Sequence, residues 1–303
     1  MKKRILNTSL IIILMLMCYE LLIKSSEIKT SILLSFDLWK NNLFPYLFPF
    51  FIISDLLINL NFIYYLNKYL KNIMYKLFRI NCYSSFVFFM SIISGIPSNA
   101  KYINTLIKNR QMTSKDANKI ILFTHFCNPL FILGFIGSIL NKKISIMILF
   151  SHYITNIIIG LFTRNYNKND LVKFNINKTT NNPLKIISSS IINSINTLLL
   201  ILGVISFFSI VTTIINNNIS SPLIKAIICS IFEITQGINN INILNISLKM
   251  KAIIITFIIS FGGLSSHMQV MSILEDNNIS YLKYLISRII HAILASIILY
   301  FLI

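Results

Sequence analysis

Charged residues are scarce in this sequence. Asp, Glu, Lys and Arg make up 12% of its 303 residues, about half of the share that soluble domains carry. Hydrophobic residues make up 55%, and the mean hydropathy is +0.74. No stretch outside the apolar runs is long enough for a separate soluble domain of ordinary size. The composition therefore predicts an all-α polytopic membrane protein, with the lipid bilayer as its first partner.

Acidic residues are rarer still. There are 9 Asp and Glu against 27 Lys and Arg, which gives a formal net charge of +18. Nucleic-acid-binding proteins also carry such a charge. Here the basic residues lie singly in loops between apolar runs and form no stripe, so we expect no nucleic-acid partner. Lysine outnumbers arginine and Ile and Asn are abundant, which indicates an A+T-rich genome. We interpret much of the charge as membrane-flanking residues that orient helices.

Signatures of catalysis, metal binding and disulfides are missing. The four cysteines, Cys18, Cys82, Cys127 and Cys229, are far apart and form no C-x-x-C pair, and the four histidines form no H-x-x-x-H. There is no G-x-S-x-G, P-loop, G-x-G-x-x-G or H-E-x-x-H motif. We therefore expect no enzyme activity, no metal, no cofactor and no ATPase within this chain.

What the sequence has instead is a series of apolar runs. They cover roughly residues 5–23, 43–63, 84–100, 117–140, 144–163, 184–215, 222–240, 252–274 and 282–303. A spanning helix needs about 20 apolar residues, and most of the runs qualify. The runs at 84–100 and 222–240 are short and hold polar motifs, so each is either a span or a re-entrant hairpin. We expect about 7–9 membrane segments.

The distribution of charge favours the hairpins. With a cytoplasmic N-terminus and two re-entrant runs, 19 of the 27 Lys and Arg, Lys101 and Arg288 among them, lie on the cytoplasmic side and 8 on the other. The positive-inside rule favours this layout. It has seven spans and two hairpins that enter from opposite sides of the membrane, which predicts inverted repeats with broken helices.

The same pattern predicts how the chain is organised. Residues 1–30 form an N-terminal transmembrane helix, which we expect to stay uncleaved because no small-x-small site follows its apolar run. Residues 31–163 form the first repeat, and residues 184–303 form the second. Residues 164–183 are a polar linker between them, rich in Asn and Lys.

Polar interruptions lie at matching places in the two halves, as in transporters made of repeats. Glycine, proline and polar side chains are costly in a bilayer unless they are buried in protein or line a wet cavity. Helix amino ends exposed at such breaks favour anions. The candidate solute-binding residues are Ser94, Gly95, Pro97, Ser98, Asn99, Lys101 and Asn128 in the first half, and Glu233, Thr235, Gln236, Gly237, Gly262, Gly263, Ser265, Ser266 and Gln269 in the second.

Glu233 is the most informative of these candidates because it lies deep in apolar surroundings, after the run Ile-Ile-Cys-Ser-Ile-Phe at 227–232. A carboxylate in such surroundings must be protonated, paired or hydrated. The functional interpretation is coupling to protons or ions, or binding of a cation or the solute. The alternative is a carboxylate near the membrane edge that snorkels or caps a helix.

Other polar residues have simpler explanations beside the functional one. Pro97 also fits an ordinary turn between two spans. Asn128 and Gln269 also fit hydrogen bonds between helices, as do the hydroxyls of the second half. We interpret Asp55 and Glu20 as interfacial, since both lie near the ends of apolar runs.

Five strings carry a resemblance to a known family. They are LFPYLFPFF at 43–51, SGIPSNAK at 94–101, NPLFILG at 128–134, FEITQG at 232–237 and SFGGLSSHMQV at 260–270. Together they resemble the YlbJ family of sporulation integral membrane proteins over nearly the whole chain, and the last string is the most specific. The chain departs from the family at Asn99, where glycine is usual. It departs again at Cys127-Asn128, where a small residue and glycine usually precede the proline.

The resemblance implies a nucleoside-recognition or Gate-type membrane domain in a protein of endospore formation. One member of the family is linked to moving dipicolinic acid into the forespore across the outer forespore membrane. We therefore expect a multi-pass carrier of a small anionic solute, dipicolinic acid before others, whose candidate residues meet near the middle of the membrane. A nucleoside or heterocycle carrier is the first alternative. A non-transporting membrane partner in spore cortex or coat assembly is the second.

Overall fold

The regular structure of this chain is helical. The computed structural model describes residues 2–167 and 183–303, and within these ranges it contains helices and turns but no β-strand. The predicted linker at 164–183 therefore lies largely outside the described residues. Together with the apolar spans given below, the helical structure confirms an all-α, multi-pass integral membrane protein.

The helices of the first half are α1 (Lys2–Ile23), α2 (Ser25–Leu38), α3 (Phe44–Asn59), α4 (Phe62–Phe78), α5 (Cys82–Ser94), α6 (Ser98–Lys108), α7 (Ser114–Ile120), α8 (Gly137–Ile139) and α9 (Lys142–Phe162). Two π-helical stretches, Trp39–Leu43 and Phe131–Ile136, precede α3 and α8. The helices of the second half are α10 (Pro183–Asn218), α11 (Pro222–Phe232), α12 (Ile234–Asn242), α13 (Leu248–Phe261), α14 (Gly263–Ile273) and α15 (Tyr281–Leu302).

Several of these helices begin at a capping residue. Asn81, Asn141 and Ser247 each accept a backbone N–H of the following first turn, at the starts of α5, α9 and α13. Thr113 and Asp116 form a capping box at the start of α7. Such caps satisfy backbone donors that have no partner within the helix.

Five of the described helices are long and apolar enough to cross a membrane: Ser25–Asn59, Lys142–Asn165, Leu184–Asn218, Leu248–Ile273 and Tyr281–Leu302. A sixth candidate is the pair Lys68–Phe78 and Cys82–Ser94, which is bent by 88°. Two shorter apolar helices are Leu14–Ile23 and Pro222–Phe232. The larger number of segments and the inverted repeat stay predictions.

The prediction that the apolar run at 117–140 forms a single membrane-spanning helix is wrong. The apolar run at 117–140 is interrupted, because α7 ends at Ile120 and residues 121–128 have no regular structure. The Asn128-Pro129 pair accounts for part of this difference, since the residue before a proline is disfavoured in a helix. Side chains from other helices account for the rest, because they hydrogen-bond the main chain that a helix would have satisfied.

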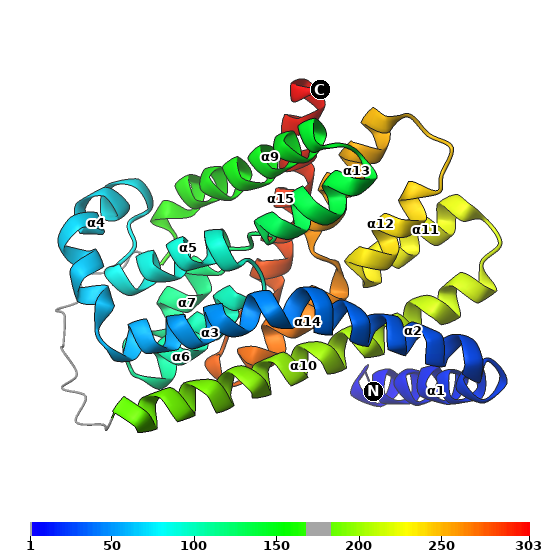
Figure 1. The fold of residues 1–303 in the computed structure, drawn as a ribbon, viewed down its shortest axis with the longest axis horizontal. Coiled ribbons are helices and arrows are strands. Elements are labelled where there is room, and N and C mark those ends of the chain that lie inside the picture. Colours follow the sequence, from blue (N-terminus) through cyan, green and yellow to red (C-terminus); the bar gives the residue numbers. More distant parts are fainter. Residues whose placement is uncertain (1, 168–182) are drawn as a thin grey trace.

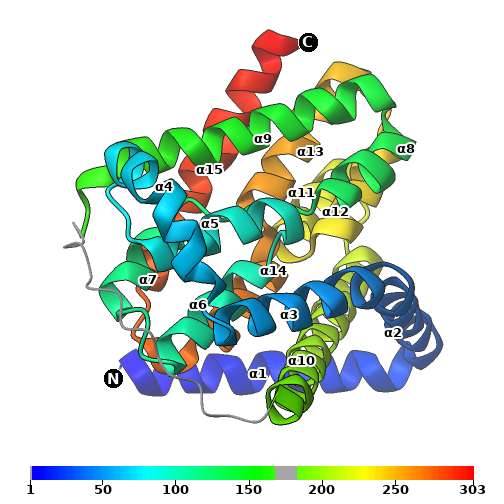
Figure 2. The ribbon, with the colours of Figure 1, turned by 60° about the vertical axis from the view of Figure 1, so that its left-hand side comes forward.

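The helices form three groups in space. Figure 1 shows α10 crossing most of the length of the molecule, and it contacts both α2 and α3. On the opposite side, α15 contacts both α9 and α13. In Figure 2, α5, α11 and α12 lie between these two groups, with α9, α13 and α15 above them and α3 and α10 below.

Both large hydrophobic cores draw on the two halves of the chain. One surrounds Phe86, Phe123 and Phe126 of the first half and also includes Val270 and Tyr284 of the second. The other joins residues of 127–148 to residues of 226–299. The two halves therefore pack into one another and do not form separate bodies.

A pair of helical glycines tests this packing. A methyl group on Gly160 of α9 would lie 2.8 Å from the ring of Phe123 and 2.9 Å from that of Phe78, whereas one on Gly203 of α10 would meet no atom within 4 Å. We expect Gly160→Ala to destabilise the protein by about 1–3 kcal/mol through overpacking. Gly203→Ala should be neutral, or stabilising by up to about 1 kcal/mol. Thermal unfolding in detergent measures both, and equal midpoints would contradict the packing described.

Candidate functional site

The first break lies between α5 and α6, at residues 95–97. Gly95 has a φ of +77°, and a Cβ there would lie 2.6 Å from the backbone nitrogen of Asn128. Only glycine allows this conformation and this close approach together. Ile96 N–H donates a hydrogen bond of 2.8 Å to the carbonyl of Phe126. The tip of this helical hairpin therefore rests directly on the irregular segment at 121–128.

The second break lies between α11 and α12, where Glu233 is a single extended residue. Its side chain is 6% exposed, and its carboxylate accepts the N–H of Gln236 at 2.8 Å, so it caps α12. A Cβ on Gly237 would lie 2.5 Å from the Cα of Ser230. Glycine therefore allows α11 and α12 to fold back on each other. Glu233 does cap a helix, as the alternative interpretation held, but it does so inside the protein.

The third break separates α13 from α14 at two glycines with positive φ, Gly262 at +96° and Gly263 at +59°. A Cβ on Gly263 would lie 3.4 Å from the carbonyl oxygen of Phe232 and 3.5 Å from the nitrogen of Ile234. This break therefore packs against the turn that contains Glu233. In the same way, Gly95 packs against Asn128 in the first half.

A cavity of about 110 Å³ lies where these breaks meet. Seven of the sixteen candidate residues line it: Pro97, Asn128, Glu233, Thr235, Ser265, Ser266 and Gln269. Apolar side chains of the long helices close it, including Leu43 and Leu47 near α3 and Ile201 and Ile205 of α10. Candidate residues separated by up to 172 positions in the sequence, from Pro97 to Gln269, thus share one small and mostly apolar cavity.

The amino ends of three helices reach this cavity. Pro97 directly precedes α6, Thr235 lies in the first turn of α12, and Ser265 and Ser266 lie in the first turn of α14. Helix amino ends carry partial positive charge and unpaired N–H groups. Glu233 already supplies a carboxylate to one of them. The arrangement is therefore suited to hold a polar solute that bears negative charge.

The other candidates are not among the residues that line the cavity. Four of them, Gly95, Gly237, Gly262 and Gly263, shape the breaks, and Gln236 supplies the N–H that Glu233 caps. Ser94 accepts a hydrogen bond of 2.8 Å from the hydroxyl of Tyr102. Ser98 and Asn99 are fully buried in the first turn of α6.

Lys101 points toward a partner that the sequence did not identify. Its Nζ lies 3.4 Å from a carboxylate oxygen of Asp55 on α3 and donates to Ser194 of α10 at 2.8 Å. It also lies 4.3 Å from the centre of the Phe51 ring. The interpretation of Asp55 as interfacial is wrong, because its side chain is 2% exposed and paired. The Lys101–Asp55 pair joins the first hairpin to α3 and α10.

Polar side chains from α15 hold the start of the irregular segment. Arg288 is fully buried and donates to the carbonyl of Leu122 and to Ser287, whose hydroxyl also bonds the Leu122 carbonyl. Its Nη1 lies 3.0 Å from His291 Nδ1. Arg288 therefore lies on a helix and is not a loop charge, and its position toward the cytoplasmic side stays a prediction. In the described part of the chain, no carboxylate lies within salt-bridge distance of it.

Side chains from α9 hold the end of the same segment. His152 Nε2 accepts the N–H of Cys127 at 2.9 Å, and Asn156 donates to the carbonyl of His125 at 3.0 Å. The Tyr153 hydroxyl lies 3.1 Å from the carbonyl of Cys127. Sequence reasoning missed these residues. The signal that was available is a series of polar residues at 151, 152, 155 and 156 within an otherwise apolar span.

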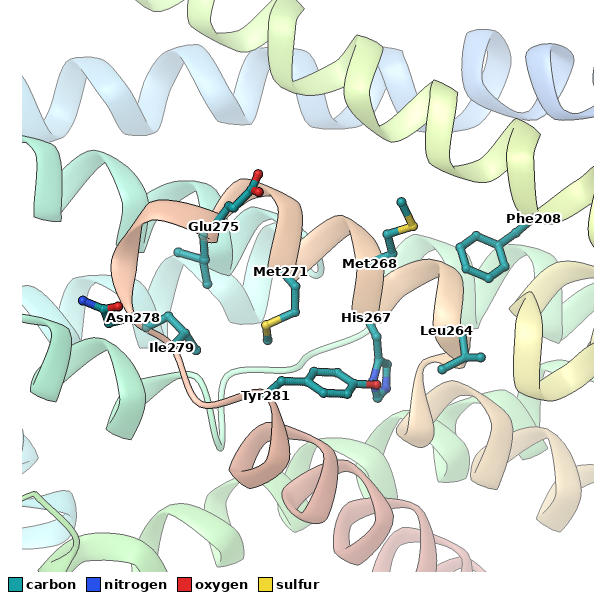
Figure 3. A pocket seen from close by; sticks show the side chains of 10 residues that line it. Phe208, Leu264, His267, Met268, Met271, Glu275, Asn278, Ile279 and Tyr281 are labelled. Carbon is teal, nitrogen blue, oxygen red and sulfur yellow. The ribbon is translucent and has the colours of Figure 1, made fainter. Parts of the chain in front are cut away.

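A larger hollow of about 630 Å³ lies between α10, α14 and α15. Figure 3 shows Met268 and Met271 on α14, with the ring of Tyr281 beside His267 and with Glu275 and Phe208 at opposite ends. Of the candidate residues, none lines this hollow. It is more open, and the polar motifs of the two halves do not meet there, so we place the candidate site at the smaller cavity.

Comparison with known proteins finds one informative match. The chain is 28% identical over 301 residues to the sporulation integral membrane protein YlbJ of Bacillus subtilis (strain 168), a match that covers 86% of this chain and 74% of that protein. No family model matches the chain. No solved structure matches it either.

The role of Tyr153 gives a test of the irregular segment. Its hydroxyl donates to the carbonyl of Ile92 at 2.8 Å and lies 3.1 Å from that of Cys127. We expect Tyr153→Phe to lower the free energy of unfolding by about 1–3 kcal/mol, because it leaves buried carbonyls without this donor. Tyr46→Phe is the control, since Tyr46 is 43% exposed. Thermal unfolding compares the two, and an equal stability of both variants would contradict this role.

The Lys101–Asp55 pair gives a second test. Lys101→Met leaves a buried carboxylate unpaired, which we expect to cost about 3–5 kcal/mol, and Asp55→Leu in the same chain should recover most of that loss. The control is Lys24→Met, which breaks the partly exposed Lys24–Glu20 pair of 3.0 Å. This change should cost less than about 1 kcal/mol. Equal loss in Lys101→Met and Lys24→Met, measured by thermal unfolding, would rule out a buried pair.

Proposed function

The chain belongs to the YlbJ family of sporulation integral membrane proteins, and we propose that it is a carrier that moves a small anionic solute across a membrane during spore formation. Dipicolinic acid is the first candidate solute and the outer forespore membrane the first candidate location. The observation that carries the proposal is the cavity at the meeting point of the helix breaks, reached by three helix amino ends. Carriers made of repeats bind solutes at such breaks.

We infer an inverted repeat from the order of the elements. Each half has a long helix (α3 or α10), a broken hairpin (α5–α6 or α11–α12), an interrupted segment (α7–α8 or α13–α14) and a final long helix (α9 or α15). In each half the tip of the hairpin packs on the interruption that follows it. With α1 and both hairpins counted, this order gives nine membrane segments.

The chemistry of the cavity supports an anionic solute. Lys101 does not supply the attraction, because it is paired with Asp55. Helix amino ends supply it instead. The Glu233 carboxylate occupies one of these ends through the N–H of Gln236. A solute carboxylate would compete with Glu233 for the N–H groups at this helix end. Protonation of Glu233 would weaken its own bond and leave these N–H groups free for the solute. Glu233 is therefore the proposed coupling or gating residue.

The size of the cavity requires movement. A volume of about 110 Å³ is below the roughly 300–1,000 Å³ of pockets that enclose drug-sized ligands. An adjoining hollow of about 380 Å³ shares Ile96, Asn128 and Phe131 with it. We propose that the two hollows join when the hairpins move, which admits a ring dicarboxylate and then closes behind it.

A nucleoside or other heterocycle carrier is the second candidate function, favoured by the amide and hydroxyl groups of Asn128, Ser265, Ser266 and Gln269 at the cavity. The non-transporting partner in spore cortex or coat assembly is the third. Uptake of dipicolinate would support the first function and uptake of nucleosides the second. Uptake of neither would support the third.

Uptake by reconstituted protein tests the proposal. Proteoliposomes that contain trapped terbium(III) become luminescent when dipicolinate enters, and we expect faster uptake than in empty liposomes. Glu233→Gln keeps an oxygen for the cap but loses the charge. It should slow uptake about tenfold or more, since a hydrogen bond to a charged group contributes about 1.5–3 kcal/mol.

The matched control is Glu275→Gln, because Glu275 is exposed at the larger hollow, and its uptake rate should be unchanged. Excess uridine should not compete with dipicolinate. Competition by uridine would favour the heterocycle carrier. If neither dipicolinate nor uridine enters faster than in empty liposomes, the carrier function is ruled out and the assembly partner is favoured.

A further inference from the structure

Helix α4 lies at one end of the molecule and turns away from the helix that follows it. The segments Lys68–Phe78 and Cys82–Ser94 are at 88° to each other. Residues with left-handed backbone bound α4 on both sides, Asn61 at φ +57° and Arg79 at φ +53°. In Figure 1, α4 is at the left-hand end, where α3 ends and α5 begins. If α5 enters the membrane, α4 lies parallel to the membrane surface.

One face of α4 packs on the protein. Ile63, Met74 and Phe78 are nearly fully buried in the larger hydrophobic core, and Leu66 and Leu70 pack against it. The spacing of these residues by three, four and seven positions follows one face of a helix. The helix is therefore attached to the protein along its length, and its remaining faces are left exposed.

A second face presents aromatic and apolar side chains outward. Phe62, Tyr65, Tyr69 and Ile73 follow one another at intervals of three and four, and Tyr65, Tyr69 and Ile73 are 61%, 72% and 54% exposed. Tyrosines are enriched where a protein meets the membrane–water interface, because their rings are apolar and their hydroxyls need water or headgroups. This stripe therefore fits the interface better than either water or the hydrocarbon interior.

The third feature is a set of exposed lysines on the same helix. Lys68, Lys71 and Lys76 lie outside the buried face, and Lys68 lies 5.8 Å from the centre of the Tyr69 ring. A lysine at the centre of a bilayer costs about 2.5–3.5 kcal/mol, so three of them argue against α4 as half of a span. An amphipathic helix with this composition lies in the interface plane.

Two further basic residues lie beside the carboxyl end of α4: Arg164, and Lys119 of α7, which is fully buried. Arg164 donates to the carbonyl of Lys76 at 2.7 Å. Lys119 donates to the carbonyls of Arg79 and Arg164 at 2.8 and 2.9 Å. Three segments that the positive-inside rule places on the cytoplasmic side therefore meet at one corner. The cytoplasmic leaflet is the one that carries anionic lipids.

We propose that α4 is an interfacial helix that binds the headgroups of anionic phospholipids through Lys68, Lys71 and Lys76, with its tyrosine stripe at the acyl boundary. This surface fixes the orientation of the first hairpin, because α5 continues from α4 after only three residues. It is separate from the cavity and does not depend on the identity of any transported solute.

Depth measurements in nanodiscs test the placement. Cys18 is the exposed cysteine and the other three are buried, so Cys18→Ser gives a background for spin labels at Tyr65→Cys, Tyr69→Cys or Ile73→Cys. An interfacial helix gives the three labels the same depth near the phosphate level. A half-span changes depth by about 1.5 Å per residue, or about 12 Å from 65 to 73, and that result would overturn the proposal.

Lipid preference tests the lysines. A fluorophore at Tyr69→Cys is quenched by brominated phosphatidylglycerol or brominated phosphatidylcholine in nanodiscs of equal composition. We expect at least about fivefold enrichment of the anionic lipid, since one lysine near a charged surface contributes about that factor. The triple change Lys68→Gln, Lys71→Gln and Lys76→Gln should reduce the preference to below about twofold.

The matched control changes the same number of lysines elsewhere. Lys40, Lys142 and Lys143 are exposed, and they are three of the eight basic residues that the charge distribution predicts on the non-cytoplasmic side of the membrane. Their replacement by Gln should leave the enrichment at Tyr69→Cys unchanged. Equal loss in both triple variants would show a general charge effect and reject the site. An unchanged preference in the α4 variant would reject it as well. Thermal unfolding verifies that both variants are folded.

Discussion

The structure depends on one requirement: main chain that leaves its helix inside an apolar environment must find hydrogen-bond partners. Residues 121–128 are the largest instance. Their carbonyl and N–H groups are satisfied by Arg288 and Ser287 from α15, by His152 and Asn156 from α9, and by the main chain of the first hairpin. The burial of Arg288 and His152 is explained by these bonds. They replace the bonds that a continuous helix would have made.

The irregular conformation of residues 121–128 determines where the cavity lies. Gly95 can approach the backbone of Asn128 closely because it has no side chain. Gly263 approaches the turn at Glu233 in the same manner. These two close contacts bring helix amino ends from both halves to one small space. Longer side chains at these glycines would separate the breaks, and the polar groups would then face lipid or apolar protein.

Much of this was predictable from the sequence. Long apolar runs such as 184–215 and 282–303 appear as helices with nearly the expected bounds, because length and hydropathy decide such elements. The resemblance of the motif strings to the YlbJ family agrees with the 28% identity to YlbJ of Bacillus subtilis, and the seven candidate residues at the cavity come from those strings. The failures have a common cause. The run at 117–140, the burial of Asp55 and the burial of Arg288 all depend on a partner far away in the sequence, and hydropathy averaged over a window contains no information about such partners.

The bond between Arg288 and Leu122 has a consequence for biosynthesis. The two residues are 166 positions apart, and Arg288 belongs to the last helix. At about 5–20 residues per second, the ribosome adds the arginine on the order of 10–30 s after the leucine. During that interval the carbonyl of Leu122 is already in or near the membrane and has neither Arg288 nor Ser287 to bond. The first half therefore leaves the insertion machinery before it can fold to completion, and α15 acts as the final clamp on a segment made long before it.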